Sequence, residues 1–406
     1  MNYSEMLAAL TARGASRWKL GCEPTRQLLA ALGRPDLAAT NVVVAGTNGK
    51  GSTSALLAAA LQQDGRRVGL FTSPHLVHFT ERIRIDGEAI AQASAPALYQ
   101  RVVAAAGGIG VQPTFFECTC AMAAVAFMEA RVDIGVWEVG VGGRLDATNA
   151  VSHQLSVITR IALDHQDLLG TSLSQIAAEK AGVIAPCQPV VLAPQARRDA
   201  RAVRAVVARV AARQKAALID AEPASDLAER LPPYQRDNIG CAWRAAQVLG
   251  THPAAFRRAL DAFHWPGRYH WLSRPAPVLL DGAHNEDGMR AFAVALRQDA
   301  RLAHRRLAVV FSSLRGRDAG ALAAPLRALP APIFVCPSSS RRSLTKAHLM
   351  RKVAGAAGCD TPALALARAR ASAGRDGVVL VAGSLALVGD VLGLLGNAAT
   401  EVRPDG

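Results

Sequence analysis

Residues 41–63 read NVVVAGTNGKGSTSALLAAALQQ, and this stretch decides the fold class of the chain. An apolar run predicts a buried strand that ends at Ala45, a glycine-rich turn follows it, and Ser52 and Thr53 open a helix. Glycines let successive backbone N–H groups turn inward, and the helix N-terminus adds its positive end, so this turn suits a polyphosphate. Lys50 would then reach the terminal phosphates, and a hydroxyl of Ser52 or Thr53 would face a magnesium-bound phosphate.

Short apolar runs followed by helix-length segments recur through the rest of the chain. Runs that are apolar on both faces favour a parallel sheet covered by helices on both sides. The segment 263–277, FHWPGRYHWLSRPAP, separates two sets of such runs and is typical of a hinge rather than of an element in either set. We therefore expect an α/β protein of two domains, 1–269 and 270–406. The predicted strands are 41–45, 67–71, 133–139 and 156–159 in the first set, and 277–280, 307–311, 332–336 and 378–382 in the second.

The net charge of +14 raises the question of a nucleic-acid partner. Only six of the 46 basic residues are lysine, and no run of five basic side chains occurs. The densest stretch, 197–213, spaces its arginines among alanine and valine as an amphipathic helix does. The single-strand grooves of nucleic-acid-binding proteins interleave aromatic and basic residues, and the sequence lacks that pattern. We therefore interpret the charge as general arginine-rich surface that helps attract anionic substrates, and expect neither a nucleic-acid nor a membrane partner.

Composition and cysteine spacing indicate the class of protein and the cellular compartment. A chain that is 50% hydrophobic over 406 residues can bury a large core, which excludes a disordered tail protein and a disulfide-stapled mini-protein. The seven cysteines are scattered and form no CxxC pair, which is typical of reduced thiols in the cytosol. The first ten residues carry Glu5 and lack the basic and apolar regions of a signal peptide. The apolar stretch 377–396 is interrupted by Gly383, Ser384 and Asp390, and we expect a strand, a turn and a helix there rather than a membrane span.

Several motifs, taken in order, resemble one enzyme family. GTNGKGST at 46–53 resembles the phosphate loop of the Mur-ligase superfamily, whose members use ATP to join a carboxylate to an amino acid. Later segments resemble the folylpolyglutamate synthases and dihydrofolate synthases, in particular the bifunctional bacterial type. These segments are VGLFTSPHLVHFTERIRIDGE (68–88), PTFFEC (113–118), WEVGVGGRLDATN (137–149), LDHQDLLGTSLSQIAAEKAG (163–182), WPGR (265–268), DGAHN (281–285) and VAGSLALV (381–388).

The resemblance implies a magnesium site, with two ions, formed by Ser73, Glu138 and His165. Oxygen and imidazole ligands from loops after strands suit a hard cation that also binds nucleotide phosphates. Taken singly, the three residues also fit a turn, a strand end and a helix cap. The resemblance further implies that Lys180 is carbamylated, which would make this lysine an anionic metal ligand. The alternative is an ion pair of Lys180 with an acid such as Glu179, and arginine could not carry this modification.

Two segments resemble the pterin-binding elements of family members that accept dihydropteroate. Phe115 and Phe116 offer a flat apolar surface, and Glu117 and Asp146 can accept hydrogen bonds from the N–H groups of a heterocycle. The alternative is that the two phenylalanines belong to the core. The implied dihydropteroate-binding residues are Thr114, Phe115, Phe116, Glu117, Leu145, Asp146 and Ala147.

The resemblance assigns the nucleotide to both domains. Arg268 lies at the expected hinge, so domain closure could bring its guanidinium onto phosphate charge; the alternative is a hinge salt bridge. The alternative for Asp281 is a turn or N-cap residue, and His284 resembles a contact to phosphate or acyl phosphate. The implied ATP-binding residues are Thr47, Asn48, Gly49, Lys50, Gly51, Ser52, Asn238, Arg268 and Asp281, and the implied catalytic residues are Lys50, Lys180 and His284.

The chain departs from the usual family pattern around the hinge and the nucleotide. Tyr269 and His270 follow Gly-Arg, where the family has an apolar residue and Glu. Glu286 follows DGAHN in place of Pro, and Tyr234 precedes Gln235 in place of His. These departures leave ATP-dependent chemistry as the expectation and open the choice of substrate.

We therefore expect a Mur-ligase-like phosphate-loop ATPase domain with a mostly parallel sheet, followed by a smaller Rossmann-like glutamate-ligase domain. The implied reaction joins L-glutamate to dihydropteroate and to reduced folates through an acyl phosphate, with ATP, Mg²⁺ and a monovalent cation. We further expect a cytoplasmic monomer. Two alternatives remain: a Mur-type ligase that acts on another carboxylate or amino acid, and a nucleic-acid-stimulated NTPase.

Overall fold

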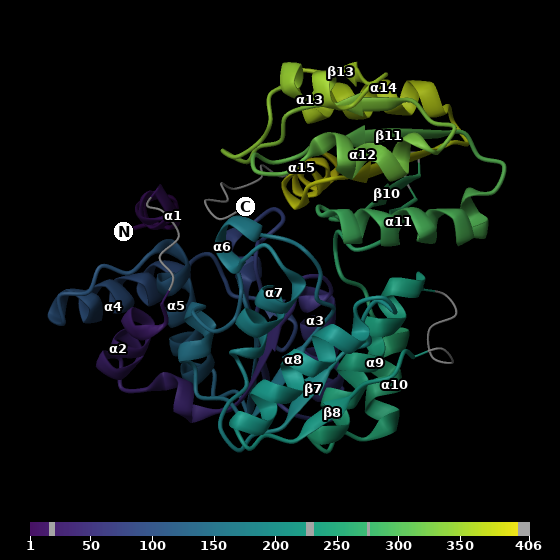
Figure 1. Ribbon diagram of the computed structural model, residues 1–406. Coiled ribbons are helices and arrows are strands. Elements are labelled where there is room, and N and C mark those ends of the chain that lie inside the picture. The colour runs from purple at the N-terminus through teal and green to yellow at the C-terminus, as the bar shows by residue number, and fades with distance from the viewer. Residues whose placement is uncertain (16–20, 225–230, 274–276, 397–406) are drawn as a thin grey trace.

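The computed structural model describes residues 1–15, 21–224, 231–273 and 277–396, and in these ranges the chain forms two sheets (Figure 1). The first is eight-stranded in the order β4-β3-β2-β5-β1-β6-β7-β8. Its strands are parallel from β2 to β8, and β3 and β4 extend it as antiparallel edge strands. The bounds are β1 (Thr40–Ala45), β2 (Val68–Phe71), β3 (Ile83–Ile85), β4 (Glu88–Ala89), β5 (Ile134–Glu138), β6 (Leu155–Ile158), β7 (Val190–Leu192) and β8 (Leu218–Asp220).

Helices cover both faces of this sheet because its central strands are apolar on both sides. In β1, Val43 and Ala45 pack on one face, and Val42 and Val44 pack on the other. The first face meets α1 (Tyr3–Ala12), α2 (Glu23–Ala31), α4 (Ala95–Gly108) and α5 (Phe115–Glu129), and its far end carries α7 (Leu173–Ala181) and α8 (Ala200–Arg213). The second face meets α3 (Lys50–Gln63), α9 (Pro233–Val248) and α10 (Pro253–Asp261). The short helices are η1 (Arg13–Ala15), η2 (Pro35–Ala38), η3 (Phe79–Arg82), η4 (Ala147–Ala150) and α6 (Gln166–Leu169).

The second sheet is six-stranded in the order β13-β12-β11-β14-β10-β9, and only β9 is antiparallel. Its strands are β9 (His270–Leu272), β10 (Val278–Leu280), β11 (Leu307–Phe311), β12 (Ile333–Val335), β13 (Ala357–Gly358) and β14 (Val378–Ala382). One face packs against α11 (Glu286–Gln298), α12 (Ala319–Arg327) and α13 (Lys346–Lys352), and the other packs against α14 (Pro362–Ala373) and α15 (Leu385–Gly396). The short η5 (Ala300–Leu302) follows α11. In Figure 1, α11 lies along the boundary between the two sheets, above α9.

The two-domain α/β architecture with mostly parallel sheets is confirmed. The predicted hinge, 263–277, is longer than the segment that lies outside both sheets. His270–Leu272 form β9, so part of segment 263–277 belongs to the second sheet, and residues 274–276 lie outside the described ranges. The apolar stretch 377–396 forms β14, a turn and α15, as expected. No helix within the described ranges is long and apolar enough to cross a membrane.

Candidate active site

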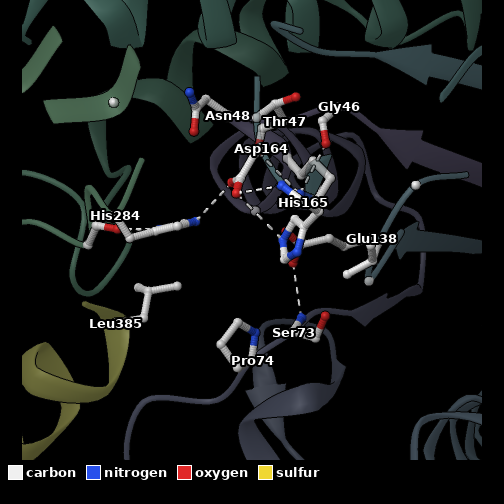
Figure 2. Close-up of a pocket in the computed structure, with 18 of the residues that line it drawn as sticks. Gly46, Thr47, Asn48, Ser73, Pro74, Glu138, Asp164, His165, His284 and Leu385 are labelled. Carbon is white, nitrogen blue, oxygen red and sulfur yellow. Dashed lines mark hydrogen bonds and ion pairs between the residues drawn. The ribbon is translucent and has the colours of Figure 1, made fainter. Parts of the chain in front are cut away.

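A cavity of about 270 Å³ lies where the carboxyl ends of strands in both sheets face each other. It is lined by the phosphate loop and α9 of the first domain, and by the loops that follow β10, β11 and β14 of the second. Figure 2 shows Gly46, Glu138 and His165 facing His284 and Leu385 across this space. Ligands of α/β proteins bind at the carboxyl ends of the strands, so this cavity is the candidate active site. All the residues assigned to ATP, metal or dihydropteroate in the sequence line it.

The phosphate loop depends on glycine where the neighbouring helix comes close. Gly49 has φ +92, and a Cβ there would lie 2.0 Å from Oδ1 of Asn238 on α9. Helix α3 begins at Lys50, two residues before the start expected from the sequence, so its N-terminal N–H groups face the cavity. Of the two hydroxyl residues, Ser52 lines the cavity, whereas Thr53 is fully buried and does not line it.

The side chains of the phosphate loop are held in place by the loop itself and by its neighbours. The Lys50 ammonium donates to the carbonyl oxygens of Gly46 at 3.2 Å and Thr47 at 3.4 Å, and burial lowers the pKa of Lys50. Thr47 Oγ1 donates to the carbonyl oxygen of Ala162 and accepts from the Ala162 N–H, both at 3.1 Å. These contacts join the phosphate loop to the segment that carries His165.

The residues assigned to magnesium come together from three loops. The Ser73 N–H donates to Glu138 Oε2 at 3.0 Å, as the dashed line in Figure 2 shows. Glu138 ends β5, and burial raises the pKa of its carboxyl while Lys50 opposes that shift. His165 has φ +49, and burial lowers its pKa to about 4, so the imidazole is neutral at pH 7 and can ligate a metal.

Lys180 on α7 also contacts the phosphate loop. It is 4% exposed, and its Nζ donates to the Gly46 carbonyl oxygen at 2.8 Å. Burial and the neighbouring Lys50 lower the pKa of Lys180 to about 7. Among the described residues, no group of three or more His, Cys, Asp or Glu side chains is placed to hold a metal ion. A metal held by Glu138 and His165 would therefore need further ligands, from residues of other types such as Ser73 or from the substrates.

The two segments assigned to dihydropteroate line the cavity, and their side chains differ in burial and in free hydrogen-bonding atoms. Thr114 caps α5, since its Oγ1 accepts from the Glu117 N–H at 3.3 Å and Glu117 Oε2 accepts from the Thr114 N–H at 2.7 Å. Glu117 Oε1 is buried beside the cavity and accepts no hydrogen bond. Phe115 is 2% exposed, and Arg82 lies over its ring at 5.0 Å, whereas Phe116 is only partly buried. Phe115 is thus the core residue of the pair, and Phe116 is the more exposed one.

The second of these segments is fixed mainly by its own hydrogen bonds. Asp146 Oδ1 accepts from the N–H and the hydroxyl of Thr148 at 3.0 and 2.7 Å, and its Oδ2 accepts from the Val141 N–H at 3.0 Å. Burial raises the pKa of Asp146. The carboxylate therefore caps η4, and Leu145 and Ala147 line the cavity on either side of it.

The residues assigned to ATP outside the phosphate loop lie on both sides of the domain boundary. Arg268 approaches Gly282 closely, since a Cβ at Gly282 would lie 2.7 Å from Arg268 Nη1. Asp281 Oδ2 accepts from the Tyr234 hydroxyl at 2.6 Å and from the Tyr269 N–H at 2.9 Å, and its Oδ1 accepts from the Ala283 N–H at 2.8 Å. Asp281 thus joins α9, the hinge and the loop after β10, and Tyr234 and Tyr269, two departures from the family pattern, supply two of its three donors.

Six further residues at the site were not singled out from the sequence. At their centre is Asp164, which accepts from Asn285 Nδ2 at 2.9 Å and lies 3.4 Å from Arg317 and 3.8 Å from His284 (Figure 2). Burial alone would raise the pKa of Asp164, but Arg317, His284 and His165 together lower it, while burial lowers the pKa of His284 to about 3. Asp164 and Asn285 belong to the motifs 163–182 and 281–285, but no motif or pattern in the sequence identified the other four as site residues. Five of the six line the cavity, namely Arg160, Asp164, Asp287, Arg317 and Arg342, and the sixth, Asn285, is hydrogen-bonded to Asp164.

Comparisons with known proteins agree with this arrangement. Residues 267–385 match the model of the Mur ligase glutamate ligase domain. The chain is 32% identical to the dihydrofolate synthase/folylpolyglutamate synthase of Bacillus subtilis over 92% of its own length and 96% of that protein. It is 36% identical to a "Probable bifunctional folylpolyglutamate synthase/dihydropteroate synthase" of Halobacterium salinarum, covering 92% of this chain, and spans 49% of the length of that longer relative.

Two solved structures cover nearly the whole chain. One is Escherichia coli FolC in complex with DHPP and ADP, with a TM-score of 0.89, 28% identity and 98% of each chain covered. The other is a bifunctional folylpolyglutamate synthase/dihydrofolate synthase with Mn, AMPPNP and L-glutamate bound, with a TM-score of 0.85, 30% identity and 98% and 99% of the two chains covered. From the identity to the full-length Bacillus enzyme, this chain belongs to the dihydrofolate synthase/folylpolyglutamate synthase family of Mur-type ligases.

Proposed function

We propose that this chain is an ATP-dependent, ADP-forming ligase that joins L-glutamate to dihydropteroate, giving dihydrofolate, and to reduced folates, giving polyglutamates. The observation that carries the proposal is one shared cavity. Its walls combine a phosphate loop, a partly exposed Phe116 beside an unpartnered Glu117 oxygen, and the cationic side chains of Arg317 and Arg342. Family membership and the relatives crystallised with nucleotide, DHPP and L-glutamate support the same reaction.

In the first step, a carboxylate oxygen of the pterin substrate attacks the γ-phosphorus of ATP, and the bond from that phosphorus to the β-γ bridging oxygen breaks. The products are an acyl phosphate and ADP. Lys50 and the N–H groups at the start of α3 face the cavity and would stabilise negative charge on the transferring phosphoryl group. Arg268 would add charge from the hinge once both domains are docked.

In the second step, the amine of L-glutamate attacks the acyl carbon, phosphate leaves, and the nitrogen loses a proton, which gives the amide. The amine must be neutral to attack, so the site must both hold an anionic amino acid and accept a proton. Arg317 and Arg342 supply the positive charge on the second domain's side. His284 faces Asp164 nearby, and we assign it the contact to the acyl phosphate.

The residues present fit a magnesium ion. Glu138 is a buried carboxylate that accepts from the Ser73 N–H, and the neutral His165 lines the same cavity. Hard cations favour carboxylate and hydroxyl oxygens together with phosphate oxygens. When bound, magnesium would offset charge on the ATP phosphates. Ser73, Glu138 and His165 would hold it, and the relative solved with Mn and AMPPNP supports a divalent cation with the nucleotide.

We further propose that Lys180 is carbamylated. Carbamylation requires a neutral amine, and burial beside Lys50 brings the pKa of Lys180 down to about 7. The modification would replace a buried positive charge with a negative one next to the cationic Lys50. A carbamate at this position would serve as an oxygen ligand for a second magnesium ion.

We propose in addition that the enzyme is a cytoplasmic monomer whose domains divide at 269/270 and that it acts without nucleic acid. The glutamate ligase match begins at residue 267, close to that boundary. The arginines that contribute to the +14 charge include Arg160, Arg268, Arg317 and Arg342, which line the cavity, where the expected substrates are anionic.

The test is ADP release by the purified protein with ATP, Mg²⁺, K⁺ as the monovalent cation, L-glutamate, and either dihydropteroate or tetrahydrofolate. We expect release with each pterin only when glutamate is present. Lys50→Ala should abolish release, whereas Lys352→Ala, at an exposed lysine on α13, should not change it. Release with another acid but neither pterin would favour the Mur-type alternative, and release stimulated by DNA or RNA would favour the NTPase.

A further inference from the structure

Arg160 touches the phosphate loop through its backbone and the second domain through its side chain. It follows β6, and its carbonyl oxygen accepts hydrogen bonds from the N–H groups of Thr47 at 2.8 Å and Asn48 at 3.1 Å. Its Nε and Nη2 donate to the two carboxylate oxygens of Asp287 at 2.8 and 2.7 Å. Such a two-pronged arginine–carboxylate pair fixes direction as well as distance.

Asp287 belongs to the first turn of α11 in the second domain and also reaches the phosphate loop directly. Asn48 Nδ2 donates to Asp287 Oδ2 at 3.0 Å. Asn48 and Asn285 also exchange side-chain hydrogen bonds, at 3.1 and 3.0 Å between the amide nitrogen of one and the amide oxygen of the other. The N-terminal end of α11 is therefore hydrogen-bonded to one residue of the phosphate loop by two side chains and to Arg160, which anchors that loop, by a third contact.

The pair of Arg160 and Asp287 is partly buried, unlike a surface salt bridge. The side chains of Arg160 and Asp287 are 24% and 11% exposed, and Asp237 on α9 lies 3.9 Å from the same guanidinium. Burial raises the pKa of Asp237 to about 6, while Arg160 opposes that shift. Removing one partner of a partly buried pair leaves the other charge less well compensated, even with Asp237 at 3.9 Å from Arg160, so the loss exceeds that of an exposed pair.

We propose that Arg160 and Asp287 are positioning residues for the nucleotide. Together they hold Asn48 and the backbone of the phosphate loop in the ATP-binding conformation while the second domain is docked. Docking and nucleotide binding then stabilise each other, because two equilibria that share one set of contacts are coupled reciprocally. The proposal rests on the proposed function only in that the phosphate loop binds a nucleotide, and it holds whichever acid the enzyme ligates.

A competing explanation is that Arg160 itself contacts phosphate and Asp287 only restrains it. The two explanations differ in what Asp287→Asn does. If the pair positions the loop, Arg160→Gln and Asp287→Asn both weaken ADP binding, and the double variant is no weaker than either single variant. If Arg160 contacts phosphate, Asp287→Asn frees the guanidinium, so ADP binding is unchanged or tighter, while Arg160→Gln alone weakens it.

The experiment is isothermal titration of the full-length protein with ADP and Mg²⁺, with the melting temperature measured on each variant. We expect each single variant to bind ADP about tenfold more weakly, which corresponds to about 1.4 kcal/mol, and Arg160→Lys to recover part of the loss. The KM for ATP should rise with little change in kcat at saturating ATP. The matched controls are Arg204→Gln and Asp220→Asn, which break a similar pair between α8 and β8 that is exposed and outside the cavity.

Each outcome decides the matter. A lower melting temperature with an unchanged ADP dissociation constant would make the pair merely structural and would overturn the proposal. Unchanged or tighter binding by Asp287→Asn would also overturn it, in favour of direct phosphate contact. If a glutamine or asparagine variant does not fold, Arg160→Lys carries the comparison, and wild-type affinity in that folded variant would count against the proposal. Normal ADP binding without pterin-dependent ligation would instead refute the proposed function and leave this inference standing.

Discussion

Lys50 and Lys180 donate hydrogen bonds to one and the same atom, the carbonyl oxygen of Gly46, at 3.2 and 2.8 Å. Lys180 is buried and Lys50 is partly buried, and the positive charge of Lys50 lowers the pKa of Lys180. Burial and Lys50 together bring the pKa of Lys180 to about 7. Backbone carbonyl oxygens, that of Gly46 shared by both lysines and that of Thr47 at 3.4 Å from Lys50, do not fully compensate two ammonium charges, so this pair of lysines gains from a change of charge on one of them.

We predict that ligase activity requires a negative group on Lys180. Lys180→Ala should lose activity by at least about a hundredfold, as expected when a group that stabilises transition-state charge is removed. A short-chain carboxylate such as acetate should restore part of it by occupying the vacated space. Lys180→Arg, which keeps the positive charge and cannot be carbamylated, is the matched control and should remain inactive. Protein incubated with ¹³C-bicarbonate should show a carbamate resonance by NMR, and a wild-type spectrum identical to that of Lys180→Ala would contradict the modification.

The two neighbouring phenylalanines should differ in effect. Phe116→Leu removes a flat surface at the cavity, where the ring centroid of Phe116 lies 5.6 Å from that of Phe71. We expect the KM for dihydropteroate to rise about three- to tenfold, because an aromatic contact contributes about 0.5–1.5 kcal/mol. Phe115→Leu should instead cost about 1 kcal/mol of stability with little change in that KM. Steady-state kinetics and urea unfolding separate the two, and a larger kinetic effect at Phe115 would reverse the assignment.

Tyr234 and Tyr269 provide a second matched pair. Tyr234→Phe removes the hydroxyl that donates to Asp281 Oδ2 at 2.6 Å and leaves a buried carboxylate short of a donor. We expect a loss of about 1–3 kcal/mol in stability and a higher KM for ATP. Tyr269→Phe removes a hydroxyl bonded to Asp299 at 2.9 Å, away from the cavity, and should affect stability alone. Equal KM values for ATP in both variants would show that the Tyr234 bond does not bear on the nucleotide.

Stability should fall as the pH drops below about 6.5. Burial, together with His264 at 4.3 Å between ring centroids, lowers the pKa of His270 to about 4. Between the unfolded pKa of about 6.5 and the folded value, the unfolded chain binds a proton that the folded protein excludes, so unfolding becomes easier as pH decreases. His270→Gln should reduce this pH dependence, and His304→Gln, at an exposed histidine, should not. Thermal unfolding from pH 7.5 to pH 4.5 measures both, and parallel curves for wild type and His270→Gln would exclude His270 as the cause.

The sequence pattern was sufficient to predict an element where all of its characteristic residues lie in one short segment. The phosphate loop, its lysine and the long apolar strands were predicted because strand, turn and helix follow one another within about twenty residues. Six strands, β3, β4, β7, β8, β9 and β13, were not predicted, and each has only two or three residues, which is too short for a clear periodic pattern. The amphipathic pattern over 197–213 corresponds to α8, whose Val203, Val206 and Val207 are buried.

By itself, the sequence determined the fold class, the phosphate loop and the set of motifs that belong to one site, since each depends on residues close together in the chain. The tertiary structure decided which side chains of these motifs face the cavity. Ser52 rather than Thr53 lines it, and of the two phenylalanines beside it Phe115 is buried whereas Phe116 is partly exposed, because the packing of α3 and α5 sets which side of each helix is buried. It alone paired Arg160 with Asp287, 127 residues apart, because such contacts arise from how the two domains dock and leave no periodic trace in either segment.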